Sequence, residues 1–388
     1  MSRDYRHIVV GLGGIGSAAA YWLARRCGAD VLGLERFEIG HERGASHDHS
    51  RIIRHSYHTP AYVELTRGAY DSWAQLEADA DETLIVKTGG IDLWPAYAAI
   101  PMEDYTSSLT ACSVPYELLG AHEVMQRWPQ FRIDDDTRAL FQADGGIAPA
   151  ARCNAAHIRM ARRHGATLRE RAPVTSVRPI DDEFEVAAGG ERYRCERLVI
   201  AADAWTNEIL AHFDVELPLT VTQEQVTYWA SPRLADFAPD RFPIWIWMDE
   251  PSFYGFPVFG ERGVKAAQDV GGREVTPQTR TFDTDREALR RVTEFLDAHI
   301  PDALGPIIYT KSCLYTMPPD RDFVIDAVPG QPHAYAALGA AHGFKFASLF
   351  GRILSDLALD GETRYGIDQF AVDRPSLTMK DPVKSFMI

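Results

Sequence analysis

The sequence predicts an α/β protein. Its first domain is built on a largely parallel sheet, and its discontinuous second domain is of the α+β type, on a mixed or antiparallel sheet. Two observations support this class: a glycine-rich turn joins an apolar strand to a helix near the N-terminus, and a second apolar strand runs into a small-residue turn near residue 200. The chain has 388 residues and is 46% hydrophobic, which suggests two domains.

Residues 7–34 predict a complete βαβ unit of the Rossmann-like type. A buried strand at 7–10 leads into the motif Gly11-Leu-Gly13-Gly-Ile-Gly16, which is followed by a helix and a second strand. The glycines let the backbone approach a pyrophosphate, and Glu35, about 20 residues beyond the motif, can accept the ribose hydroxyls. A chance glycine turn is the alternative. The strand, the helix and Glu35 together favour a dinucleotide site.

Residues 197–207 form a second nucleotide-domain signature, an apolar strand followed by a turn and a helix. Asp203 occupies the turn. The other predicted elements are antiparallel strands at 223–229, 244–248 and 253–257 and an amphipathic helix at 285–298.

The nucleotide-binding domain is expected to be discontinuous because its signatures lie far apart in the chain. We assign residues 1–85, 145–220 and 308–388 to it. The substrate domain is expected from residues 86–144 and 221–307.

Composition excludes several classes of partner. The formal charge of −15 opposes binding to nucleic acid or to an anionic membrane, and a small zwitterionic substrate would need a local basic patch. The apolar run at 8–23 contains glycines that suit a strand, turn and helix better than a signal peptide, and no other run is long enough to span a membrane. Five scattered cysteines predict no disulfide framework and favour a reducing, cytoplasmic compartment. The clustered histidines at 41–58 have no zinc-site spacing, so no metal is expected.

Two C-terminal segments add a more specific signal. One runs Cys313-Leu-Tyr315-Thr316 and continues through Asp320, Phe323 and Ile325-Asp326; the other is His342-Gly343-Phe344-Lys345-Phe346. With the glycine fingerprint, these segments resemble the monomeric sarcosine oxidase family of FAD-dependent amine oxidases, which includes N-methyltryptophan oxidase and pipecolate oxidase. The resemblance extends from Val9 to about Pro375. It implies a Rossmann-like FAD-binding domain and a monomer.

The resemblance implies that Cys313 attaches FAD through a thioether to the 8α-methyl carbon. This chemistry needs a thiolate, which nearby positive groups would favour. A buried structural cysteine is the alternative. The other residues implied to contact FAD are Gly11, Gly13, Ile15, Gly16, Glu35, Arg36, His47, Ser50, Arg51, Val174, Ala202, Trp205, Gly343, Phe344 and Lys345.

The segment Ser50-Arg51-Ile-Ile-Arg54-His55 is similar to the family's Thr-Arg-Ile-Ile-Arg-His segment. The resemblance places Arg51 over the flavin ring and Arg54 on the substrate carboxylate, with Lys345 as the second cation. Structural ion pairs of the two arginines are the alternative.

Lys265 aligns with the lysine that promotes reaction with dioxygen in this family, where a positive charge stabilises the developing anion. An exposed lysine beside a turn is the alternative. Tyr254 and Tyr315 are expected to line the pocket. The chain departs from the sarcosine enzymes at Asp269, where they have histidine, and at Trp245, where they have methionine. We expect Asp269 to pair with Lys265 or to orient the substrate amine, and Trp245 to reshape the cavity.

The sequence therefore predicts an oxidase that takes hydride from a carbon beside a secondary amine of a sarcosine-like amino acid, with dioxygen reduced to hydrogen peroxide. Oxidation of a cyclic imino acid is the alternative, because related oxidases carry an aspartate in this region and a run like 344–352. Two other classes remain open: an NAD(P)-dependent dehydrogenase, which leaves the C-terminal segments unexplained, and a flavoprotein that binds an amine without turnover.

Overall fold

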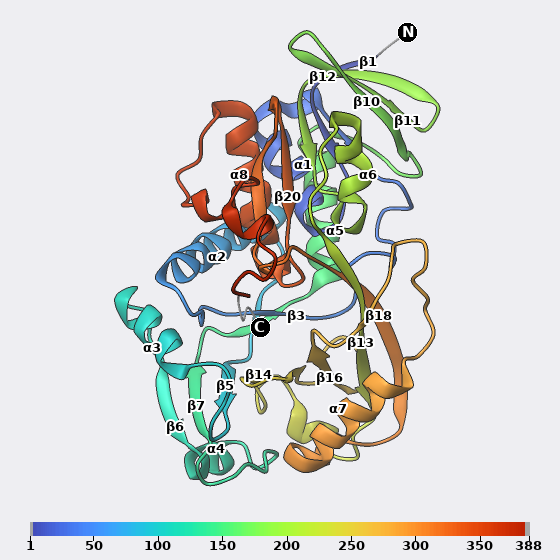
Figure 1. Ribbon diagram of the computed structural model, residues 1–388. Helices are drawn as coiled ribbons and strands as arrows, with labels where there is room; N and C mark the ends of the chain where they lie inside the picture. Colours follow the sequence, from blue (N-terminus) through green and yellow to red (C-terminus); the bar gives the residue numbers. More distant parts are fainter. Residues whose placement is uncertain (1–2, 385–388) are drawn as a thin grey trace.

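Two large sheets make up most of the molecule (Figure 1). The computed structural model describes residues 3–384. An eight-stranded sheet lies in the upper part of Figure 1 and a nine-stranded sheet in the lower part. A three-stranded sheet of β3 (Arg51–Ile53), β8 (Gly146–Ala148) and β4 (Val86–Lys87) is the third sheet, and Figure 1 shows β3 between the two large ones.

The eight-stranded sheet has a parallel centre. There β1 pairs in parallel with both β12 and β2, β2 with β9, and the end of β12 with β20, whereas β10, β11 and the start of β12 form antiparallel pairs. Its strands are β10 (Val174–Ile180), β11 (Glu183–Ala188), β12 (Glu191–Ile200), β1 (Arg3–Val10), β2 (Val31–Leu34), β9 (Thr167–Arg169), β20 (Gln331–Leu338) and β19 (Val324–Val328).

Helices pack beside the parallel strands. Helix α1 contacts α5 and α8, and α2 contacts the same two helices. Their bounds are α1 (Gly14–Cys27), α2 (Pro60–Ala80), α5 (Ala150–Arg163) and α8 (Ala347–Asp360), and the short helix α6 (Thr206–Leu210) follows β12.

The glycine fingerprint explains why α1 begins where it does. Gly11 has a φ of 87°, and a Cβ there would lie 2.5 Å from the carbonyl oxygen of Ala201. A Cβ on Gly16 would lie only 1.9 Å from the carbonyl oxygen of Gly11. Only glycine therefore fits this turn, which packs directly against the end of β12. The predicted βαβ unit and the predicted strand ending near residue 200 are both confirmed.

The nine-stranded sheet is antiparallel except where β14 pairs in parallel with β5. Its strands are β17 (Arg273–Glu274), β13 (Thr220–Trp229), β16 (Val264–Asp269), β15 (Ser252–Phe256), β14 (Ile244–Trp247), β5 (Gly90–Trp94), β7 (Arg138–Gln142), β6 (Glu117–Gly120) and β18 (Ile307–Met317), which pairs with β13. Helices α3 (Met102–Ala111), α4 (Ala121–Arg127) and α7 (Arg286–His299) belong to this half.

Helix α7 confirms the predicted amphipathic segment. The side chain of Asp285 caps its N-terminus by accepting hydrogen bonds from the backbone N–H groups of Glu287 and Ala288. Val292, Phe295 and Leu296 form its buried face, within the core of the nine-stranded sheet. None of the helices in the described part of the chain has the length and apolarity needed to cross a membrane.

The sheets suggest a refined domain division. All strands of the eight-stranded sheet fall within the ranges predicted for the nucleotide-binding domain, but β18, which was included in the range 308–388, pairs with β13 along its length. We therefore propose that the last boundary follows Met317, so that β18 belongs to the substrate domain.

Candidate functional site

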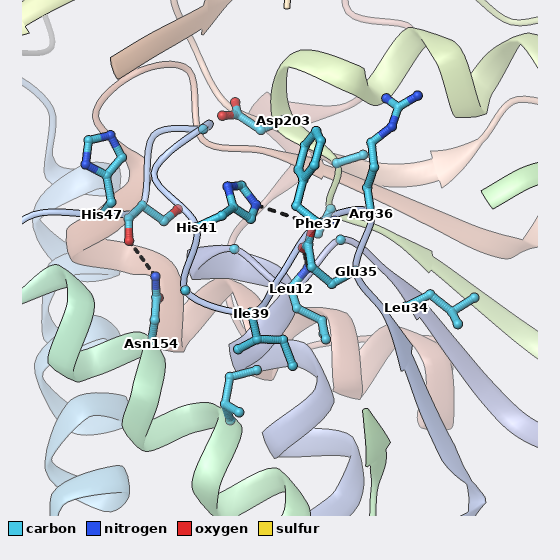
Figure 2. Close-up of a pocket in the computed structure, with 18 of the residues that line it drawn as sticks. Leu12, Leu34, Glu35, Arg36, Phe37, Ile39, His41, His47, Asn154 and Asp203 are labelled. Carbon is cyan, nitrogen blue, oxygen red and sulfur yellow. Dashed lines mark hydrogen bonds and ion pairs between the residues drawn. The ribbon is translucent and has the colours of Figure 1, made fainter. Parts of the chain in front are cut away.

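A cavity of about 540 Å³ lies at the carboxyl ends of β1, β2 and β12 (Figure 2). This is the edge where parallel α/β sheets bind nucleotides. The residues of the sequence prediction that line it are Gly11, Gly13, Glu35, Arg36, His47, Val174, Ala202 and Trp205.

Glu35 is fixed at the floor of this cavity. Its carboxylate accepts hydrogen bonds from the backbone N–H groups of Leu12 (2.9 Å) and Phe37 (3.0 Å), and His41 lies 3.3 Å away. Burial acts to raise the pKa of Glu35, but these partners outweigh it and hold the pKa below its ordinary value. Glu35 is therefore an anionic acceptor, as a ribose-binding carboxylate must be.

Two smaller cavities adjoin this one, and the three together are called the cofactor track below. The second, of about 80 Å³, shares Gly13, Ser46 and Asp203 with the first and is also lined by Ile15 and Gly343. The third, of about 60 Å³, shares Arg51, Tyr315, Ala341 and Phe344 with the second. The three cavities therefore form a row from the glycine turn of the eight-stranded sheet to the nine-stranded sheet.

The third cavity carries opposite charges on different walls. Lys345 comes from the turn η6 (Gly343–Phe346), and Asp269 comes from the end of β16. Burial, reinforced by the charge of Arg54, lowers the pKa of Lys345 to about 7, and burial raises the pKa of Asp269 to about 6. Tyr254 also lines this cavity, and the Tyr315 hydroxyl donates to Asp269 over 3.3 Å. The structure thus brings these four residues of the sequence prediction together around one cavity.

Arg51 lies on the wall shared by the second and third cavities. Its guanidinium donates to the backbone carbonyls of Ser50 and Ala45, both at 2.8 Å, which fixes its orientation. Arg54 lines none of the three cavities. Its guanidinium is buried and donates to Asp92 of β5 over 2.8 Å.

Lys265 pairs with Asp48 rather than with Asp269. Its ammonium lies 2.7 Å from the Asp48 carboxylate and donates to the backbone oxygen (2.9 Å) and the hydroxyl (3.1 Å) of Ser50. The expected Lys265–Asp269 pair is therefore absent among residues 3–384, which leaves Asp269 for the cavity.

The expectation that Trp245 reshapes the cavity is wrong. Successive side chains of a strand point to opposite faces of the sheet, and it is Ile246 that lines the third cavity. Trp245 points to the other face, where its ring stacks on Phe295 of α7 with centroids 5.6 Å apart.

Cys313 is buried in β18, directly before Leu314 and Tyr315, which line the second cavity. Burial raises the pKa of its thiol to about 11, although the charges of Arg51 and Lys265 act in the opposite direction. The nearby cations that were expected to favour the thiolate are present, but burial outweighs them.

Sequence reasoning missed the residues that hold the loop beside the fingerprint. The backbone N–H of Gly14 donates to the Ser46 hydroxyl (2.9 Å), and Asn154 of α5 donates to the Ser46 carbonyl (2.6 Å, Figure 2). Asp48 and Asp92, which pair with Lys265 and Arg54, were missed as well. The dense run of polar residues at 46–50 was a signal that could have identified Asp48. Asp92 lies in an apolar strand, and no sequence signal indicated its role.

The track fits an adenine dinucleotide cofactor. The cradle formed by Gly11 and Gly16 would be filled by any side chain. Within the described part of the chain, neither ring nitrogen of His47 has a hydrogen-bond partner, although this buried side chain lines the first cavity. A buried imidazole without partners is costly, so a ligand group is the expected partner.

The connected cavities define a protein that binds a dinucleotide along a parallel sheet and presents one end of it to a small, charged cavity, as redox enzymes do. The chain belongs to the DAO family of FAD-dependent oxidoreductases, whose profile matches residues 6–357. It is a flavin-dependent enzyme of the expected fold class.

Individual relatives are similar over nearly the full length. A monomeric sarcosine oxidase of Streptomyces avermitilis is 35% identical, with 95% of this chain and 97% of the relative covered. An N-methyl-L-tryptophan oxidase of Escherichia coli is 29% identical, with 95% and 99% covered. Among solved structures, NikD, an unusual amino acid oxidase essential for nikkomycin biosynthesis, has a TM-score of 0.85 and 27% identity, with 100% of this chain and 99% of that chain covered.

Proposed function

We propose that this protein oxidises the N-methyl group of a small secondary amino acid of the sarcosine type. The observation that carries the proposal is the third cavity, which joins the dinucleotide track and holds Lys345 and Asp269 on separate walls. When bound, FAD supplies the hydride acceptor and passes the two electrons on to dioxygen, giving hydrogen peroxide. Water then hydrolyses the imine product, so that sarcosine would yield glycine and formaldehyde.

The charges of the third cavity suit a zwitterion. In our proposal the Lys345 ammonium binds the substrate carboxylate, and the Asp269 carboxylate orients the amine. Tyr254 and Tyr315 enclose the substrate, and Arg51 holds the cofactor side of the cavity.

Arg54 was predicted to bind the substrate carboxylate directly. Its guanidinium lies 5.4 Å from the ring centre of Tyr57, and the Lys345 ammonium lies 5.6 Å from the same centre. We propose that Arg54 supports the carboxylate site with its charge from behind this ring. Direct contact would require the guanidinium to move toward the third cavity, which it does not line.

We further propose that Cys313 carries FAD through a thioether and that Lys265 promotes the reaction with dioxygen. Forming the thioether removes the thiol hydrogen and one hydrogen of the 8α-methyl group, and dioxygen accepts both with two electrons as hydrogen peroxide. After acid precipitation, flavin should stay with the wild-type chain and leave the Cys313→Ser chain. Flavin that stays bound to the Cys313→Ser chain would refute the linkage.

The experiment for the reaction itself is peroxide release under air with a panel of amines. Sarcosine and N-methyl-L-tryptophan represent the proposed class, and L-proline, L-pipecolate and piperideine-2-carboxylate represent the cyclic alternative. The identity of the relatives favours the first group, so we expect sarcosine to give the highest kcat/KM. Peroxide from the cyclic compounds alone would replace the proposal, and flavin protein without peroxide from any amine would indicate a binding protein.

Two further expectations stay predictions. A monomer is expected from the resemblance, and a cytoplasmic location from the cysteines, all five of which are free thiols in the structure. Light scattering of the purified protein measures the first, and fractionation of the source cells measures the second.

A further inference from the structure

Asp48 is a buried carboxylate on a backbone that favours glycine. Its φ is 83°, and its side chain is 1% exposed. A non-glycine residue at positive φ is strained, and a buried carboxylate adds a desolvation cost. Glycine would avoid both costs, so the carboxylate itself needs an explanation.

The partners of Asp48 converge from four strands. One carboxylate oxygen lies 2.7 Å from the ammonium of Lys265 on β16, and the Tyr228 hydroxyl of β13 donates to both oxygens at 2.9 Å. Arg51 of β3 and Lys311 of β18 each lie 4.0 Å away. These cations, Lys265 first, hold the pKa of Asp48 well below its ordinary value despite its burial.

The contacts use every donor of the Lys265 ammonium. A lysine ammonium has three N–H donors, and its three acceptors here are the Asp48 carboxylate and the carbonyl and hydroxyl of Ser50. The nitrogen also lies 4.7 Å from the ring centre of Phe256, which lines the third cavity. Lys265 lines none of the three cavities itself; it is held in one place against Phe256, a residue of the third cavity's wall.

The charge of Lys265 depends on this carboxylate. Burial, helped by the charge of Arg51, lowers the pKa of Lys265, and Asp48 is the main group that raises it; together they leave the pKa at about 8. Asp48 thus opposes the loss of the proton that burial promotes in an unpaired lysine. A neutral amine would not stabilise negative charge developing on dioxygen.

We propose that Asp48 is a positioning residue for the oxidative half-reaction, which fixes Lys265 beside the third cavity and maintains its positive charge while dioxygen is reduced. This inference rests on the proposed role of Lys265. The strained backbone at Asp48 is then the cost of keeping a carboxylate where the lysine needs it.

The other titratable groups around the pair determine whether the pKa of Lys265 rises or falls when Asp48 is replaced. Those that face the pair are Arg51, Lys311, Tyr228, Cys313, His47 and His49. Burial lowers the pKa of His47 to about 3, so it is neutral at working pH. Without Asp48 the charged neighbours of Lys265 are cations, which lower the pKa of the lysine further. Its charge would then be lost at a lower pH than in the wild type.

The experiment is stopped-flow reoxidation of the substrate-reduced holoenzyme from about pH 6 to pH 9, a range that brackets the ordinary histidine and the lowered lysine pKa. The wild-type rate constant should fall through about pH 8. In Asp48→Asn the fall should come at least about one pH unit lower, with a rate at pH 8 at least about fivefold slower than that of the wild type and recovery toward the wild-type rate at the acid end. Reduction by substrate should change little. An Asp48→Asn enzyme with the wild-type rates and pH profile would overturn the proposal.

Three variants separate this role from a merely structural one. Asp48→Gly suits the positive φ, should fold, and should show the same shift as Asp48→Asn. Asp320→Asn is the matched control: Asp320 is also buried, pairs with Arg374 over 2.7 Å and lines none of the three cavities, so the variant should lose stability without moving the pH profile. A shift in Asp320→Asn as large as in Asp48→Asn would overturn the proposal.

Lys265→Met separates failure of this inference from failure of the proposed function. Slow reoxidation of Lys265→Met with wild-type behaviour of Asp48→Asn refutes only the role of Asp48. Wild-type reoxidation of Lys265→Met refutes the role of the lysine and the inference with it. Slow reoxidation of both variants, with the pH shift in Asp48→Asn alone, supports both.

Discussion

Single residues determine how the third cavity distinguishes its substrates. Lys345 and Asp269 carry opposite charges and approach the cavity from different halves of the fold. A buried charge attracts its counter-charge strongly because little water screens it. Recognition of the substrate as a zwitterion therefore depends on two side chains whose protonation changes near neutral pH.

Removing the Lys345 charge should weaken amino acid binding selectively. We expect Lys345→Met to raise KM for sarcosine by about 10- to 100-fold, because a hydrogen bond to a charged group contributes about 1.5–3 kcal/mol. Steady-state kinetics with a secondary amine that lacks a carboxylate is the comparison, and its KM should change little. Equal increases for both substrates would contradict a carboxylate-binding role.

The pH dependence should report Asp269. Its pKa is raised to about 6, so the carboxylate is lost as the pH falls through that value, and kcat/KM should decline below about pH 6. In Asp269→Asn this decline at acid pH should disappear. At higher pH, where the wild-type carboxylate is charged, kcat/KM of the variant should be lower than that of the wild type. The pH profile of kcat/KM for both enzymes tests this, and an unchanged acidic limb in the variant would assign it to another group.

The sequence located most of these residues but not their pairing. Lys265, Asp269 and Lys345 were found through motifs, because chemistry restricts residue types at fixed spacings. The ion pairs of Arg54 with Asp92 and of Lys265 with Asp48 join distant elements, and no local pattern encodes such a pairing. Trp245 was misplaced because the face of the sheet on which a side chain lies depends on the register of the strand. A shift of one residue along β14 exchanges Trp245 for Ile246 at the cavity.

At the scale of elements, the turn between β1 and α1 determines whether the cofactor binds. Its glycines allow the end of β12 and the start of α1 to approach closely. This part was predictable, since the turn, the strands and Glu35 are local in sequence. The pairing of β18 with β13 was not, because it joins segments on either side of a long insertion.

Gly16→Ala should therefore lose FAD. The added Cβ would lie 1.9 Å from the Gly11 carbonyl oxygen, and because this contact is with backbone the turn itself must shift. We expect a loss of stability of about 1–3 kcal/mol and a low flavin content. Gly366→Ala is the matched control, since nothing lies within 4 Å of the added atom and its φ is ordinary. Absorbance per chain and thermal unfolding measure both, and full flavin content in Gly16→Ala would contradict this account of the turn.

At the scale of the whole molecule, the cofactor track joins both sheets. Gly13 comes from the eight-stranded half, whereas Tyr315 and Asp269 come from the nine-stranded half. A ligand that fills the row contacts both halves, so its binding should stabilise them together.

The Cys313→Ser protein makes this coupling measurable, because its flavin can be removed. We expect its Tm to rise with added FAD, since a ligand at about 100 times its Kd stabilises the folded state by about 2.7 kcal/mol. ADP, which would fill only the first cavity, should raise Tm less. A Tm that does not respond to FAD would contradict the assignment of the track.

The most direct test of the account is the anaerobic absorption spectrum of the purified holoenzyme during addition of sarcosine. We expect sarcosine to bleach the oxidised flavin band and air to restore it with release of hydrogen peroxide. L-Proline and L-pipecolate should bleach it far more slowly. A flavin band that sarcosine and N-methyl-L-tryptophan leave unchanged, while a cyclic imino acid bleaches it, would contradict the proposed substrate class.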